Sequence, residues 1–336
     1  PALPISIGII VLADLRFQLA FLPMAMESVA LYDALLALAS GHLSLIDEAH
    51  KVAALETRST AIRNLAKAIS TPSDQLACYE TNAAACIAFV IYEAGVGDYR
   101  AWYTHLKGAQ HIITSTSAYS SGRLLEGPEA FKASTEGQWI LRNFAYHDII
   151  GSITLRKRPL LNGDYLHGIT DVVDSCLGVA VELLFILARI SCLDADTSPQ
   201  ERTTDDQFHA TQQRFLTACA ELEQELVNWK CHADAESGLV ALAYAYRNAV
   251  LITLYRLIRS RLKLGHIGSF DDQTSKSSAI EAVEAKIQAQ VSDTIQHVCN
   301  IPIGSAPESA LLFPVFMIGG ETRDQGHIDI VRTRLR

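Results

Sequence analysis

The sequence predicts an all-α protein, a multi-helix orthogonal or antiparallel bundle with a buried central helix. Apolar residues recur at three- and four-residue intervals along most of the chain, and the two-residue alternation of strands is not repeated. Of the 336 residues, 49% are hydrophobic and 19% are charged, which is typical of globular rather than disordered chains. We therefore expect near-complete helix, with no sheet of more than two short strands.

The first helices are predicted from apolar spacing and from start signals. Residues 21–44 should form a helix that ends at Gly41, and residues 51–69 should form an amphipathic helix. A hydroxyl, a proline and an acid over residues 71–74 are typical of a helix start, so the third helix should run from there to Glu93.

The next segment combines a capped helix with a long polar break. Asp98 can cap a fourth helix, in which Gly108 costs roughly 1 kcal/mol relative to alanine, so close helix packing is the expected compensation. Residues 115–137 are rich in serine and glycine and are interpreted as a mobile loop.

The central helix is predicted over residues 142–155, where Tyr146, Ile149 and Ile153 recur along one face. Asp148 lies on another face, and because an unpaired buried carboxylate is costly, we expect it to be partnered by a donor or a basic side chain. Three basic residues, 156–158, then follow at the end where the helix dipole favours cations, and Pro159 should stop the helix.

Two interpretations of this stretch stay open. In the first, it is a buried helix whose basic end docks a loop. In the second, the helix end faces a ligand or an anion. The ligand-binding candidates are Tyr146, His147, Asp148, Arg156 and Arg158.

The remaining chain also has helical spacing. We expect a helix from Thr170 to about Leu193 and long helices over 208–229, 238–264 and 280–298. The polar segments 194–206 and 265–278 are expected to be mobile loops. The prediction is a single helical domain over residues 1–336.

The central stretch resembles the fungal-specific transcription factor domain, the regulatory region of zinc binuclear cluster transcription factors. The resemblance rests on a short series of motifs in order: Tyr146-His147-Asp148, Gly151-Ser152, Arg156-Lys157-Arg158, Pro159-Leu160-Leu161 and Gly163-Asp164-Tyr165. Segments 105–109, 178–184 and 311–324 agree with it. The resemblance implies a regulatory role, exerted by binding a small-molecule effector or a protein co-regulator, and leaves a homodimer open.

Charge and cysteine content narrow the function further. A net charge of -9 opposes a nucleic-acid surface, so DNA contact is not expected of these residues. Seven widely spaced cysteines indicate reduced thiols of an intracellular protein, nuclear or cytoplasmic, and the six-cysteine zinc cluster of the family does not occur in the sequence. Residues 5–13 are too short and interrupted to predict a signal peptide or a membrane span.

An enzyme is the alternative. Asp174, Gly178 and Glu182 are four residues apart, the spacing at which class I terpene cyclases place a metal-binding triad. Under this alternative Mg²⁺ would be held by Asp47, Glu48, Asp174 and Glu182, with Tyr255 and Arg256 as contacts to a prenyl diphosphate. Gly178 offers no oxygen ligand, so the regulator, which needs no cofactor, is preferred.

Overall fold

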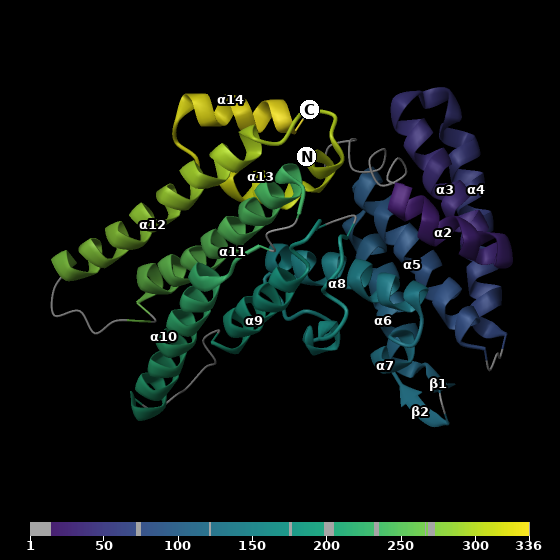
Figure 1. The fold of residues 1–336 in the computed structure, drawn as a ribbon, viewed down its shortest axis with the longest axis horizontal. Helices are drawn as coiled ribbons and strands as arrows, with labels where there is room; N and C mark the ends of the chain where they lie inside the picture. Colours follow the sequence, from purple (N-terminus) through teal and green to yellow (C-terminus); the bar gives the residue numbers. More distant parts are fainter. Residues whose placement is uncertain are drawn as a thin grey trace. The chain divides into compact units, whose positions relative to one another are not determined.

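The computed structural model describes residues 15–71, 75–120, 122–174, 177–197, 205–231, 235–265, 267 and 273–335. Helices α2 to α14 account for most of these residues, and the strands in the described ranges are the short pair β1 and β2 (Figure 1). The predicted all-α class is therefore confirmed.

The chain folds into two compact units. The first contains residues 1–148 and 164–170, and the second contains residues 149–163 and 171–336. The boundary falls inside α8, between Asp148 and Ile149. The expectation of a single domain stays a prediction.

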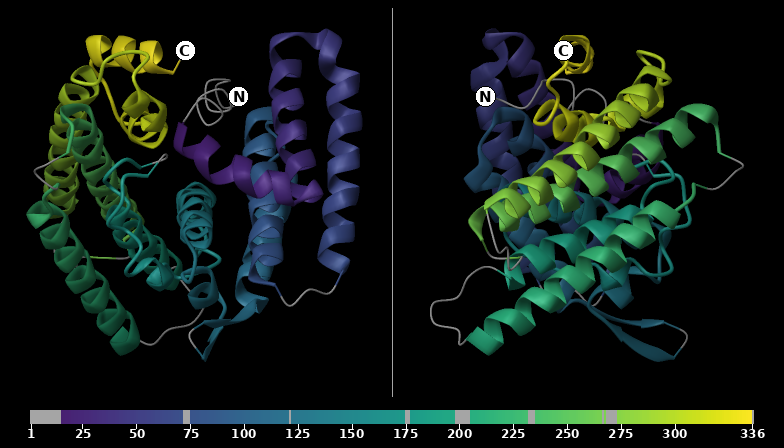
Figure 2. Two further views of the ribbon diagram at one scale, coloured as in Figure 1. Left: turned by 45° about the vertical axis from the view of Figure 1, so that its right-hand side comes forward. Right: turned by 90° about the vertical axis from the view of Figure 1, so that its left-hand side faces the viewer.

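The first unit is built around α5, of which residues 80–93 are all buried. Helices α3 and α6 pack against α5, and α4 lies beside α3 (Figure 2). The elements of this unit are α2 (Leu15–Glu27), α3 (Val29–Ile46), η1 (Glu48–His50), α4 (Lys51–Ser70), α5 (Leu76–Val96), α6 (Tyr99–Ser115), β1 (Ser117–Ser120), β2 (Arg123–Glu126), α7 (Pro128–Phe131), most of α8 (Thr135–Leu155) and η2 (Asp164–Leu166).

The helix predicted over residues 21–44 is in fact two helices. Ser28 separates α2 from α3 and caps α3, because its side chain accepts a hydrogen bond from the Leu31 amide at 3.3 Å. Gly41 does not end the helix, which continues to Ile46. A Cβ on Gly41 would overlap the Tyr92 ring, with Tyr92 Cδ2 2.7 Å away, so this glycine is required for close packing of α3 on α5.

The segment predicted as a loop over residues 115–137 contains regular structure. β1 and β2 pair antiparallel, with Ser117 opposite Glu126 and Ser120 opposite Arg123. The short helix α7 follows, and α8 already begins at Thr135, seven residues before the predicted start of the central helix. The hairpin could not be predicted from the sequence, because neither strand has the buried apolar face that produces a two-residue alternation.

The second unit is built around α11, which contacts α9, α10, α12 and α13 (Figure 1). Gly265, with φ of 73°, ends α11 in the left-handed conformation that favours glycine. The complete elements of this unit are α9 (Glu182–Asp196), α10 (Asp205–Asn228), α11 (Ser237–Leu264), α12 (Gln273–Cys299), η3 (Ala306–Ala310), α13 (Leu312–Gly319) and α14 (Gln325–Arg334).

In the part of the chain that the structure describes, two helices, Val29–Ile46 and Ser237–Leu264, are long and apolar enough to cross a membrane by length and composition alone. The apolar window of α11 is 72% buried, as expected of a core helix, whereas that of α3 is 33% buried. α3 therefore exposes an unusual amount of apolar surface.

Candidate functional site

The first part of the predicted site is the middle of α8. Asp148 is 3% exposed, so its expected burial is confirmed, whereas its pairing with a donor or basic group stays a prediction. Burial, and to a smaller extent the negative charge of Asp148, raises the pKa of Tyr165 in η2. Asp148 and Tyr165 are both buried in the first unit.

His147 lies beside the ring of Tyr146, with ring centroids 5.2 Å apart at an edge-to-face angle of 80°. Burial lowers the pKa of His147 to about 4, because the imidazolium loses its hydration. His147 is consequently neutral near pH 7 and can serve a ligand as a neutral donor or acceptor.

The shifted pKa makes stability depend on pH. The pKa is about 6.5 in the unfolded chain and about 4 in the folded chain, so the unfolded chain takes up the proton first and stability falls as pH drops from about 6.5 to 4. We expect the parent to lose about 1–2 kcal/mol more than His147→Gln between pH 7 and pH 5 in urea unfolding. His111→Gln, on the exposed side of α6, is the control. Equal losses in parent and His147→Gln would contradict the prediction.

The second part of the predicted site is the basic turn, residues 156–158. α8 ends at Leu155 because Arg156 adopts φ of 51°, the only positive φ of a non-glycine residue in the described ranges. The helix thus ends four residues before Pro159. A left-handed conformation is strained in a residue with a Cβ, so the surroundings must hold it in place.

Helix α9 supplies the groups that hold this turn. The Ser191 hydroxyl lies 2.8 Å from the Ser152 hydroxyl and donates to the Lys157 carbonyl at 2.9 Å. These contacts fix the backbone of the turn against α9.

The acidic end of α9 pairs with the basic turn. Arg156 contacts Asp194 at 3.4 Å, and Arg158 forms an ion pair with Asp196. Arg261 of α11 also donates to the carbonyl and the carboxylate of Asp194, at 2.8 and 2.9 Å. Carboxylates at the C-terminal end of a helix are disfavoured by its dipole, and these three guanidinium groups compensate for that. The name "basic latch" is used below for Arg156, Arg158, Asp194 and Asp196.

Helix α9 extends to Asp196. The basic turn at the end of α8 therefore docks onto the last turn of α9, and not onto a loop. Residues 194–196, predicted as the start of a loop, are helical, and residues 198–204 lie outside the described residues. Arg156 and Arg158 keep side-chain exposures of 62% and 57%, so solvent and ligands can reach both.

The proposed metal ligands of the alternative do not share a helix. The helix expected from Thr170 begins only at Glu182, and Asp174 instead pairs with Gly178 through two backbone hydrogen bonds of 2.7 and 2.9 Å. Gly178 has φ of 58°, which explains why the helical spacing is broken there. The four-residue spacing thus carries no information about a shared face.

The other residues of the alternative have structural contacts. The side chain of Asp47 accepts the Ala49 amide at 2.9 Å, Glu48 contacts Lys51 at 3.9 Å, and Glu182 accepts the Trp229 indole at 3.0 Å.

Tyr255 donates to Glu223 at 2.8 Å, and Arg256 contacts Glu321 at 3.1 Å. Among the described residues, no group of three His, Cys, Asp or Glu side chains is placed to hold a metal.

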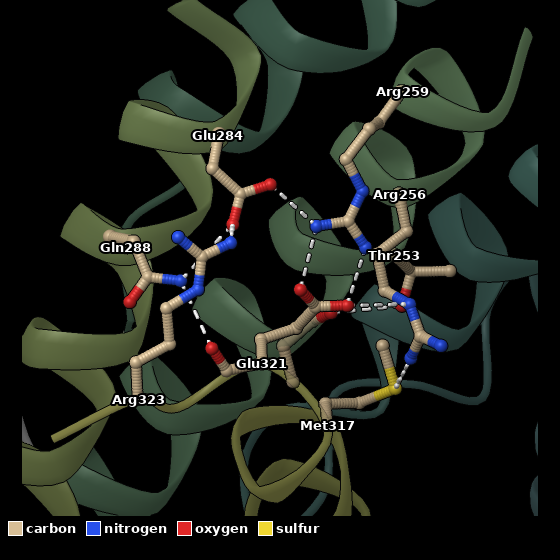
Figure 3. A network of polar contacts seen from close by, with 9 residues as sticks. Thr253, Arg256, Arg259, Glu284, Gln288, Met317, Glu321 and Arg323 are labelled. Atoms are coloured by element: carbon tan, nitrogen blue, oxygen red, sulfur yellow. Dashed lines mark hydrogen bonds and ion pairs between the residues drawn. The ribbon is translucent and has the colours of Figure 1, made fainter. Parts of the chain in front are cut away.

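One polar network in the second unit was not predicted from the sequence (Figure 3). Arg259 of α11 donates to both carboxylate oxygens of Glu321 and to Glu284 of α12, each at 2.7 Å. Arg323 also pairs with Glu284, and Gln288 donates to the Glu321 carbonyl at 3.0 Å. The helix dipole alone would favour basic residues near the end of α11, whereas Arg256, Arg259 and Arg261 have specific carboxylate partners.

Comparison with known families identifies the chain. The fungal specific transcription factor domain family matches residues 6–336. No curated protein and no solved structure matches the chain. The chain belongs to this family and has a role in transcription regulation inside the cell.

Proposed function

Because the chain belongs to the fungal specific transcription factor domain family, we propose that it is a regulatory module that works in the nucleus by binding an effector, a small molecule or a protein co-regulator. The net charge of -9 supports a module that leaves DNA contact to other residues.

The observation that carries this proposal is the basic latch. The pair between Arg158 and Asp196 joins two exposed groups, 57% and 49%, and such pairs contribute only about 0–1 kcal/mol. Asp194 is 22% exposed and is also held by the buried Arg261, so it is the less replaceable of the two acids. A planar guanidinium binds carboxylate or phosphate well. An anionic effector group, or an acidic side chain of a co-regulator, can therefore replace Asp196 as the partner of Arg158 at small cost.

Replacing Asp196 would also affect the conformation of the turn. Together with the Ser191 contacts, the ion pairs hold the strained turn at Arg156, so opening the pair of Arg158 with Asp196 loosens the end of α8. The module would then have two states that differ in the contact between the basic turn and α9, and an effector that binds one state better shifts their populations.

A charge swap tests this proposal. The chain is fused to an unrelated DNA-binding domain, and expression of a reporter gene is measured. We expect Arg158→Asp to change reporter expression several-fold, because it opens the pair with Asp196, and the double variant Arg158→Asp/Asp196→Arg to restore the parent level.

The control is Arg332→Asp, which removes an exposed ion pair with Asp329 on α14. It should leave reporter expression unchanged. The latch is not the responsive element if Arg158→Asp behaves like this control, or if the swap fails to restore expression while protein levels and thermal unfolding match the parent.

A further inference from the structure

Helix α3 carries a continuous apolar stripe on its exposed side. Six of its large hydrophobic side chains are exposed, and five of them lie along one line: Val29 71%, Tyr32 52%, Leu36 47%, Leu43 43% and Ile46 62%. Ala39, also exposed, completes the line. These six residues are called the α3 stripe below.

The spacing of the α3 stripe is that of a helix-pairing surface. Successive members are three, four, three, four and three residues apart, which are the a and d positions of a heptad repeat. The opposite side of α3, including Leu31 and Leu38, is already buried in the first unit. The stripe is therefore a second apolar face, additional to the face that packs in the core.

The solvent-exposed side of the neighbouring helix α4 differs from the α3 stripe in its charge. The exposed side of α4 carries Glu56, Arg63 and Lys67 among its apolar residues. By contrast, Asp33 is the only Asp, Glu, Lys or Arg in α3, and Asn64 of α4 donates to it at 2.5 Å. Asp33 is partly buried, and the six residues of the stripe are uncharged.

We propose that the α3 stripe is the contact surface between two copies of this chain. A two-fold dimer needs one patch that is complementary to itself, and a straight a/d stripe meets this requirement. The stripe runs along an 18-residue helix, a length of about 27 Å. Its exposed apolar side chains would form the centre of such an interface, and residues beside the stripe would complete the ~800 Å² that each partner contributes to a standard interface.

A membrane surface is the other occupant to consider, since α3 passes the length and composition test for a membrane span. Helices that lie on membranes carry Lys and Arg that attract anionic lipids. α3 has neither residue, and its other side is packed against α4 and α5. These observations favour a protein surface without charge, and a second copy provides one.

The experiment measures the mass of the 336-residue chain in solution by light scattering and sedimentation, at about 1 and 100 μM. We expect the parent to approach twice the 36.7 kDa of one chain. The double variant Leu36→Lys/Leu43→Lys should be monomeric, with the dissociation constant raised at least about 100-fold, because two buried ammonium groups per copy would lack partners.

The matched control is Leu216→Lys, another exposed leucine within a helix, on α10 of the second unit. It should remain dimeric. Circular dichroism and thermal unfolding check that both variants are folded, and hydroxyl-radical footprinting of Tyr32 should show protection that grows with concentration in the parent and the control but not in the double variant.

Three results would overturn the proposal. One is a parent that stays monomeric at 100 μM, and another is a double variant that remains dimeric while folded. The third is a monomeric parent that floats with vesicles of phosphatidylcholine and phosphatidylserine, with flotation lost in the double variant, which would assign the stripe to a lipid surface.

Discussion

Replacing Arg259 by leucine is expected to lower the free energy of unfolding by about 3 kcal/mol. Glu321 is 8% exposed and receives both of its short side-chain hydrogen bonds from Arg259. Removing the guanidinium leaves a buried carboxylate that keeps only Arg256, at 3.1 Å, and Glu284 loses a partner at 2.7 Å. The cost is the desolvation of Glu321, which is no longer compensated. Urea unfolding at pH 7 measures it.

Arg323→Leu is the matched control for this variant. Arg323 also pairs with Glu284, but its side chain is 70% exposed, so its removal should cost no more than about 0.5 kcal/mol. If the two variants lost similar amounts of unfolding free energy, the contribution of each arginine would not depend on its burial. A stable Arg259→Leu protein would show that water can reach and solvate Glu321.

The helices that could be predicted from the sequence are those with one apolar face against a core. Helices α4 and α6 have such spacing, and α4 ends within one residue of its predicted end. α12 was predicted less well, because it begins at Gln273, seven residues before its predicted start and inside the segment 265–278 that was predicted to be a loop. The prediction failed where apolar residues continued through a change in backbone direction. Residues 170–193 have the spacing of one helix, yet Gly178 takes a positive φ and the helix starts at Glu182.

The basic latch could be predicted in part. The position of residues 156–158 after a helix indicated a docked or ligand-facing end, but the partners Asp194 and Asp196 are 38 residues further along the chain. Arg259 and Glu321 are 62 residues apart. Local periodicity carries no information about such pairs, because they depend on how helices pack.

The packing role of a glycine also could not be predicted from its local sequence. Gly108 was expected to mark close packing, but an added Cβ would meet only Cys86 Sγ at 3.4 Å, an ordinary contact. The glycines that do permit close approach, Gly41 and Gly137, have no distinguishing sequence context. Their role depends on Tyr92 and on Phe131, which lie in other elements.

Gly137→Ala is therefore expected to destabilise the protein by about 2–3 kcal/mol. The added Cβ would overlap the Phe131 carbonyl oxygen and lie 2.8 Å from the Phe131 carbonyl carbon and from Glu80 Oε1. Backbone atoms cannot rotate away, so α8 must shift relative to the end of α7. The shift would also disturb the hydrogen bond from Ser134 to Glu80.

Gly95→Ala provides the contrast, because both changes add one methyl group to a helical glycine. Nothing lies within 4 Å of a Cβ at Gly95, near the end of α5, so alanine should be neutral or should stabilise by up to about 1 kcal/mol through its helix propensity. Thermal and urea unfolding of both variants measure the difference, which should be about 3 kcal/mol in favour of Gly95→Ala. If the two variants unfold alike, the backbone at Gly137 moves freely enough to accept a side chain, and α8 is not fixed by its contact with α7. If Gly137→Ala is the less stable variant by the expected amount, the packing of α8 against α7 depends on a glycine in the first turn of α8.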